Sequence, residues 1–185
     1  MPELPLEIWK DRIENELKSI KNLKVLKESS IVKQDDVVEF MIILNSLGFI
    51  ESSEGLIPKR SHRILLKLNR SFPYPGGIDF SWLSNLFHPN IHPIELSSET
   101  SGTGYICLNV LKKWSRLSDL ETTIKALKLL VENPNSDDPL NYTICLRAAE
   151  YYKKNPIENL KKQFGIDESE DKTDELDDDI IMIDD

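Results

Sequence analysis

The 185-residue chain has only two cysteines, Cys107 and Cys145, and it lacks any apolar run long enough to cross a bilayer. Two cysteines do not make a disulfide framework, and free thiols are typical of a reducing compartment. The first residues lack the basic and apolar regions of a secretory signal. We therefore expect a cytoplasmic protein without a membrane partner.

An excess of basic side chains is also missing. The net charge of −9 comes from residues 167–185, which hold eleven acids and one lysine and leave 22 basic and 21 acidic side chains on the other 166 residues. A nearly neutral domain argues against nucleic acid as the main partner. We expect residues 1–165 to form one domain and residues 166–185 an acidic, disordered tail. The tail ends on an apolar patch at 179–185, which either solvates the chain or adds a strand to a partner's sheet.

Hydrophobic periodicity predicts one helix followed by a sheet. Apolar residues recur at helical spacing over residues 6–20, with a charged face between them. Strand patterns follow at 37–44 and 64–69, with weaker ones at 24–31 and 78–83. Residues 88–118 are rich in Pro, Gly, Ser and Asn, so we expect them to be largely irregular.

Helices return in the last third of the chain. Residues 118–121 read Ser-Asp-Leu-Glu, the pattern of a capping box, and Asn133-Pro134 stops the helix that follows. A second helix is predicted from about Pro139, and a short third one between Asn155-Pro156 and Gly165.

Two interpretations of Cys107 compete on local grounds. Between Ile106 and Leu108 it could be a buried core residue, or it could be a nucleophile in an irregular, glycine-containing segment. His88, in the turn His88-Pro89-Asn90, could serve as its base in a cysteine hydrolase, or bind a metal together with His92 and Cys107. The ligand spacing is not that of a usual zinc site, and no third group that would orient the histidine is evident.

The order of these motifs resembles that of the ubiquitin-conjugating enzymes, over about residues 6–165. That family's pattern is a His-Pro-Asn turn, a glycine, the nucleophilic cysteine, a tryptophan and a Pro-Asn-x-x-Asp-Pro turn. Here these are His88-Pro89-Asn90, Gly104, Cys107, Trp114 and residues 134–139. The resemblance implies an α/β (α+β) fold with an N-terminal helix, a four-stranded antiparallel meander, an active-site loop and C-terminal helices.

The resemblance also implies roles for individual residues. Cys107 would accept ubiquitin or a ubiquitin-like protein from an activating enzyme as a thioester and pass it to a lysine. Asn90 would stabilise the oxyanion or hold the active-site loop, because an amide donates a hydrogen bond without taking a proton. Asp138 would orient the lysine and favour its deprotonation, although it also suits a helix N-cap region. His88 and Pro89 would be structural. No metal or organic cofactor is implied.

The family's ligase-binding surface uses two loops and the first helix. The corresponding positions are Tyr74 and Pro75, then Ser115, Arg116 and Leu117, with Lys10 on the helix. We expect a ligase of the RING type, although Arg116 and Leu117 depart from the family's usual Ser-Pro-Ala. Lys10 could equally lie on a plain solvated face.

Other departures mark a divergent member of such a family. The spacing between Asn90 and Gly104 is longer than usual, with extra residues near 94–101 that either gate Cys107 or form a tolerated surface insertion. Cys145 falls on the apolar side of a predicted helix and is read as core. The alternative to catalysis is a non-catalytic module of the same fold that binds or scaffolds the modifier or a ligase.

Overall fold

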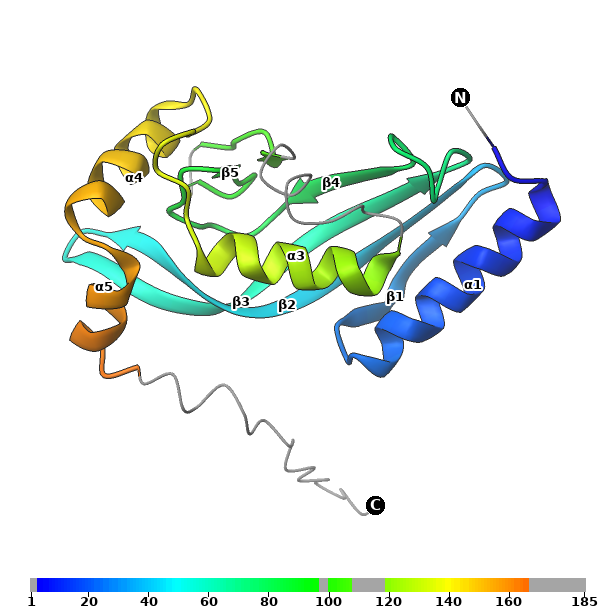
Figure 1. Ribbon diagram of the computed structural model, residues 1–185, viewed down its shortest axis with the longest axis horizontal. Coiled ribbons are helices and arrows are strands. Elements are labelled where there is room, and N and C mark those ends of the chain that lie inside the picture. Colours follow the sequence, from blue (N-terminus) through cyan, green and yellow to red (C-terminus); the bar gives the residue numbers. More distant parts are fainter. Residues whose placement is uncertain (1–2, 97–99, 108–118, 167–185) are drawn as a thin grey trace, which may run out of the picture.

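The computed structural model describes residues 3–96, 100–107 and 119–166. Figure 1 shows a helix beside one end of an antiparallel sheet, a second helix across that sheet, and two more helices at the other end. The elements are α1 (Leu6–Asn22), β1 (Leu26–Lys33), β2 (Val37–Ser52), β3 (Gly55–Asn69), β4 (Ile78–Trp82), β5 (Ile91–His92), β6 (Tyr105–Ile106), α3 (Leu120–Glu132), α4 (Thr143–Lys154) and α5 (Ile157–Gln163). The α+β fold expected from the sequence is confirmed.

Four strands form a meander in the order β1-β2-β3-β4, each antiparallel to its neighbour. The partners Phe40 and Leu66, and likewise Ile42 and Ile64, lie opposite each other and are fully buried. Partners in an antiparallel pair share a face, so these side chains form the inner face of the sheet. The strands β2 and β3 are much longer than the predicted segments because they continue into one hairpin that closes at Ser52 and Gly55.

The helix α1 packs its apolar stripe on the sheet. Trp9, Ile13, Leu17 and Ile20 are buried as the periodicity predicts, whereas Leu6 is 38 % exposed because it lies in the first turn. The indole Nε1–H of Trp9 donates to the carbonyl of Asn69 at 3.0 Å. This bond fixes the start of α1 against the end of β3.

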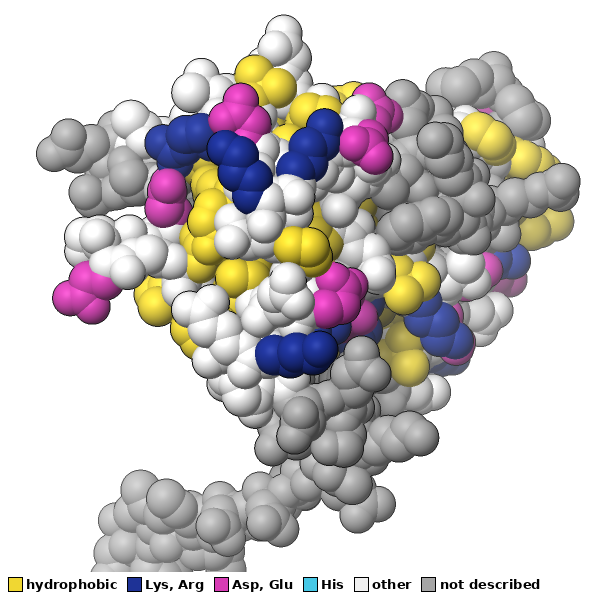
Figure 2. Space-filling model, turned by 60° about the vertical axis from the view of Figure 1, so that its left-hand side comes forward, with side chains coloured by type: hydrophobic (Ala, Val, Ile, Leu, Met, Phe, Trp, Pro, Cys, Tyr) yellow, Lys and Arg dark blue, Asp and Glu magenta, His cyan; other side chains and the backbone are white. Residues whose placement is uncertain are grey.

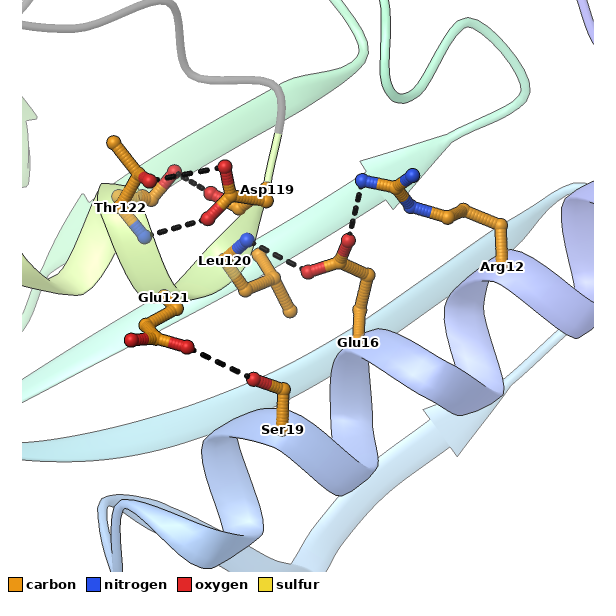
Figure 3. A network of polar contacts seen from close by, with 8 residues as sticks. Arg12, Glu16, Ser19, Asp119, Leu120, Glu121 and Thr122 are labelled. Carbon is orange, nitrogen blue, oxygen red and sulfur yellow. Dashed lines mark hydrogen bonds and ion pairs between the residues drawn. The ribbon is translucent and has the colours of Figure 1, made fainter.

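The helix α3 lies across the sheet and begins one residue later than the capping box predicted. Its N-cap is Asp119, whose carboxylate accepts from the backbone N–H of Thr122 at 2.7 Å. Ser118, the N-cap expected from the sequence, lies outside the described residues. The N–H of Leu120 donates to the carboxylate of Glu16 on α1 at 2.7 Å, and Arg12 pairs with the same carboxylate at 2.6 Å (Figure 3).

A second apolar cluster joins α4 and α5 to the β2–β3 hairpin. It contains Phe49, Phe87, Tyr152 and Leu160, and Phe164 packs on it with its ring centroid 5.7 Å from that of Phe49. Figure 2, with this end of the molecule turned forward, shows hydrophobic side chains among basic and acidic ones.

The helix α4 begins at Thr143 rather than near Pro139. Residues 139–142 instead contain a bend, in which the N–H of Tyr142 donates to the carbonyl of Leu140 at 2.8 Å, and the N–H of Leu140 donates to the carbonyl of Pro89 at 2.9 Å. The last helix is α5, with Pro156 as its N-cap, and Gly165 follows it at φ +65°. Both agree with the predicted boundaries.

Several predictions fall outside the described residues. These are the acidic tail from residue 167 onward, Trp114, and the loop positions Ser115, Arg116 and Leu117. Among the residues that are described, no helix combines the length and apolarity that a membrane span needs.

Candidate active site

A two-stranded hairpin carries the candidate nucleophile. Ile91 pairs with Ile106 and His92 pairs with Tyr105, and the N–H of Cys107 donates to the carbonyl of Asn90 at 2.9 Å. The segment predicted to be irregular therefore contains a short β ladder. Ile91 and Ile106 point into the core, where they are 0 % and 2 % exposed. Their burial anchors the hairpin, and the alternate residues face the opposite side.

Asn90 joins the cysteine strand to the Pro-Asn-x-x-Asp-Pro turn. Its carbonyl holds the N–H of Cys107, while its side-chain amide donates to the carbonyls of Asn135 at 3.0 Å and Asp138 at 2.9 Å. Its amide oxygen accepts from the N–H of Asn135 at 2.8 Å. The side chain is fully buried. Both amide protons are thus engaged, which favours the loop-holding role of Asn90 over oxyanion stabilisation.

The His88 ring is enclosed within its own turn. Its Nε2 donates to the carbonyl of Leu130 at 3.0 Å, and its Nδ1 accepts from the N–H of Asn90 at 3.1 Å. Burial lowers the pKa of His88 to about 3. An imidazole with its only lone pair already bonded cannot take a proton from a thiol. This contact pattern argues against His88 as the base of a cysteine hydrolase, and its structural role stays a prediction.

The two cysteines differ in their surroundings. Cys145 is fully buried, and its thiol donates to the carbonyl of Ile91 at 3.4 Å. Burial raises the pKa of Cys145 to about 12. Its assignment to the core is confirmed. Cys107 is also buried but is 8 % exposed, whereas Cys145 is 0 % exposed.

Asp138 is exposed, and its carboxylate makes no hydrogen bond or ion pair with the other described residues. Only its backbone carbonyl is held, by the amide of Asn90. Because α4 starts at Thr143, the alternative reading of Asp138 as part of a helix N-cap region is wrong. An unpaired carboxylate on a fixed backbone is available to an incoming amine.

Two stacked aromatic rings cover part of the hairpin, and the sequence patterns did not predict this contact. The rings of His92 and Tyr142 stack at 3.8 Å with an interplanar angle of 7°. The Nδ1 of His92 accepts from the N–H of Thr103 at 3.2 Å and lies 2.9 Å from its hydroxyl. Burial lowers the pKa of His92. His92 and Tyr142 are far apart in the chain, so no local sequence pattern predicts that their rings stack. The strand pairing places Tyr105 on the same face of the hairpin as His92.

The extra residues near 94–101 begin beside the end of β4 and return to the same place at Gly102. The N–H of Ile94 donates to the carbonyl of Trp82 at 2.9 Å, and the N–H of Gly102 donates to that of Ile94 at 2.8 Å. A Cβ on Gly102 would lie 2.0 Å from the carbonyl oxygen of Pro93. The glycine therefore permits close packing of this hairpin. Residues 97–99 lie outside the described part.

Three of the residues expected to contact a ligase, Lys10, Tyr74 and Pro75, lie in the described part of the chain. The turn that holds Tyr74 and Pro75 follows Arg70, whose guanidinium lies 5.2 Å from the Trp9 ring and donates to the carbonyl of Leu4. Arg70, which precedes this turn, therefore contacts the start of α1 and the residues before it, and Lys10 is an exposed residue of the same helix. Whether they form one binding surface remains a prediction, because the third element, residues 115–117, is not described.

The metal hypothesis depended on His88, His92 and Cys107 meeting. Within the described ranges, no three side chains of His, Cys, Asp or Glu gather as a metal site requires. Both ring nitrogens of His88 are engaged with the backbone.

Comparison with known proteins agrees with this geometry. A family model described as ubiquitin-conjugating enzyme matches residues 12–164. A stretch of 102 residues is 29 % identical to ubiquitin-conjugating enzyme E2 2 of Aspergillus fumigatus and covers 54 % of this chain and 58 % of that protein. A stretch of 99 residues is 33 % identical to ubiquitin-conjugating enzyme E2-20 kDa of Schizosaccharomyces pombe and covers 50 % and 49 %. The chain belongs to the ubiquitin-conjugating enzyme family, and it matches about half the length of these relatives.

Proposed function

We propose that this chain carries ubiquitin or a ubiquitin-like protein as a thioester on Cys107 and transfers it to a lysine. One observation carries the proposal: Asn90 bonds the backbone of Cys107 with its carbonyl and the backbone of Asp138 with its amide. It thereby holds a nucleophile next to a segment that presents a free carboxylate. The membership of the matched residues in the family supports the same assignment.

The first step is transthiolation. The sulfur of Cys107 attacks the carbonyl carbon of the modifier's C-terminal thioester on an activating enzyme, the C–S bond to that enzyme breaks, and its thiolate leaves. The thiolate of Cys107 is the reactive form, so its proton must be lost before or during the attack.

The second step is aminolysis. The nitrogen of a lysine attacks the thioester carbon, the C–S bond to Cys107 breaks, and the sulfur leaves as thiolate. The amine must lose a proton to form the amide, and the exposed carboxylate of Asp138 can orient the ammonium and accept that proton on its way to solvent. Asn90 contributes by keeping this carboxylate in place.

The partners follow from the same proposal. They are the modifier, its activating enzyme and a ligase of the RING type, for which Lys10, Tyr74 and Pro75 offer a candidate surface.

If residues 94–101 gate the thiol, deletion of the segment will change the rates of charging or discharge. Unchanged rates would remove the gating role.

Thioester charging tests the proposal. The protein is mixed with ATP, an activating enzyme and a panel of ubiquitin-like modifiers, and the products are run on gels with and without reductant. We expect a reductant-sensitive adduct that Cys107→Ala abolishes and Cys145→Ala retains. Cys107→Ser should give an adduct that resists reductant, because an ester to oxygen is not cleaved by thiols. No adduct, with a charged activating enzyme in the same tube, would favour the non-catalytic binding module.

A further inference from the structure

The hairpin that carries Cys107 has two different faces. Ile91 and Ile106 point into the core. The ladder pairs His92 with Tyr105, and the next bond joins Asn90 to Cys107. Opposite residues of antiparallel strands share a face, and residues two apart in one strand do as well. The four residues Asn90, His92, Tyr105 and Cys107 therefore share the outer face.

The segment at 135–142 covers only one strand of that face. Asn135 and the carbonyl of Asp138 bond the amide of Asn90, and the Tyr142 ring stacks on His92. One contact falls on β5 and the other on Asn90, the residue before it. Asn90 is fully buried and His92 is 8 % exposed as a result.

Tyr105 on β6 remains open. It is 51 % exposed, whereas the other three residues of this face are 8 % exposed or less. Its Cα lies about 7 Å from that of Cys107, two residues along an extended strand. An aromatic ring is thus the one open side chain of this hairpin face, directly beside the nucleophile.

The backbone beneath the ring is fixed. The N–H of Tyr105 donates to the hydroxyl oxygen of Thr103 at 3.3 Å, and Thr103 also bonds His92. Gly104, between them, has a φ of +74°, a left-handed conformation that glycine adopts without strain. A ring on a fixed strand can act as a binding surface at little entropic cost, since it has few rotatable bonds.

We propose that Tyr105 is a specificity residue that receives the aliphatic stem of the acceptor lysine. Lysine lays its methylene groups along apolar surfaces while its amine stays in water, and an ammonium is attracted to an aromatic face. Tyr105 thereby favours lysine over water and over small amines as the group that takes the acyl chain from the sulfur. The inference rests on the proposed function, because it assumes a thioester on Cys107.

The test compares two nucleophiles on one thioester. Protein charged with the modifier found in the charging assay is separated from ATP, then mixed with free lysine, with hydroxylamine, which has no aliphatic stem, or with buffer alone. The loss of thioester is followed on gels without reductant. Tyr105→Ser removes the ring, Tyr105→Phe keeps it, and Leu129→Ser removes an equally exposed apolar side chain from α3 as a control.

We expect Tyr105→Ser to lower the ratio of the lysine rate to the hydroxylamine rate about two- to fivefold, the range that a cation–aromatic contact provides at an exposed site. Tyr105→Phe and Leu129→Ser should keep the ratio of the unaltered chain. An unchanged ratio in Tyr105→Ser, or an equal loss of both rates, would overturn the role of Tyr105 and leave the thioester function standing. Failure of the unaltered chain to charge would overturn both.

Discussion

The side-chain amide of Asn90 lies 2.9 Å from the backbone carbonyl of Asp138, and the carbonyl of Asn90 holds the N–H of Cys107 at 2.9 Å. One buried residue therefore fixes the relative position of the candidate nucleophile and the candidate proton acceptor. The order of these residues along the chain carries no information about this link, which forms only in the folded protein.

The first prediction concerns Asn90→Asp. The substitution keeps an oxygen for the N–H of Asn135 but replaces two N–H donors by an oxygen that faces the carbonyls of Asn135 and Asp138. Two lost hydrogen bonds and a buried charge should lower the free energy of unfolding by about 2–4 kcal/mol. Urea denaturation measures this change.

Asn141→Asp is the matched control, because that amide is exposed. Its effect should stay within about 0.5 kcal/mol. Unaltered stability of Asn90→Asp together with slow aminolysis would contradict the loop-holding role and favour Asn90 as the donor to the oxyanion.

Much of the architecture could be predicted because it depends on local pattern. The burial of Trp9, Ile13, Leu17 and Ile20 follows the helical period, and the burial along the first half of β2 and the second half of β3 follows apolar alternation. The start of α4 could not be predicted, since the bend before it is held partly by the bond of Leu140 to the distant Pro89. A tertiary hydrogen bond of this kind leaves no periodic trace in the sequence.

The sequence proposes residues for the site but does not indicate their contacts. The spacing of His88, Asn90 and Cys107 identified the family pattern, and the structure adds what each group bonds. The stacking of His92 on Tyr142 joins two irregular segments, so neither hydrophobic period nor turn chemistry indicates it. The sequence predicts Ser118 as the N-cap of α3, because serine and aspartate both suit an N-cap. In the structure Asp119 is the N-cap, since its carboxylate accepts from the N–H of Thr122.

The second prediction concerns stability at low pH. Burial lowers the pKa of His88 to about 3 and that of His62 to about 4. A histidine with a lower pKa in the folded state binds fewer protons there than in the unfolded state, where its pKa is about 6.5. The free energy of unfolding therefore falls as the pH drops below about 6.5, and each histidine contributes about 1.4 kcal/mol per pH unit until its folded pKa is reached.

His88→Gln isolates one of these contributions. Glutamine keeps an N–H donor for the carbonyl of Leu130 and does not titrate, while His62 is unchanged in both proteins. Urea denaturation between pH 4.5 and 6 should show a slope smaller by about 1.4 kcal/mol per pH unit in the variant. Equal slopes would mean that His88 is already protonated in the folded protein.

The third prediction separates the two thiols. With its pKa raised to about 12, Cys145 is almost entirely protonated at pH 8, with roughly one thiolate in ten thousand, and its side chain is fully buried. An aromatic disulfide reagent should label one thiol per folded chain and two in urea. Cys107→Ala should leave the folded chain unlabelled, and Cys145→Ala should retain the single label. Equal labelling rates for both thiols in the folded protein would contradict the assignment of Cys145 to the core.

The last prediction concerns the contact between α1 and α3 that Figure 3 shows. The Glu16 carboxylate, 7 % exposed, accepts from the N–H of Leu120 at the start of α3 and pairs with Arg12. Glu16→Ala removes a negative group from a helix N-terminus and leaves a backbone donor without its partner, so it should cost about 2–3 kcal/mol of unfolding free energy. Glu16→Gln keeps an oxygen for Leu120 and should cost about half as much. Thermal or urea denaturation measures both, and Glu7→Ala, which removes an exposed ion pair with Lys10 and an exposed acid from the first turn of α1, should change stability by less than about 1 kcal/mol. If Glu16→Ala and Glu16→Gln cost the same, the ion pair with Arg12 rather than the cap of α3 is what stabilises this junction.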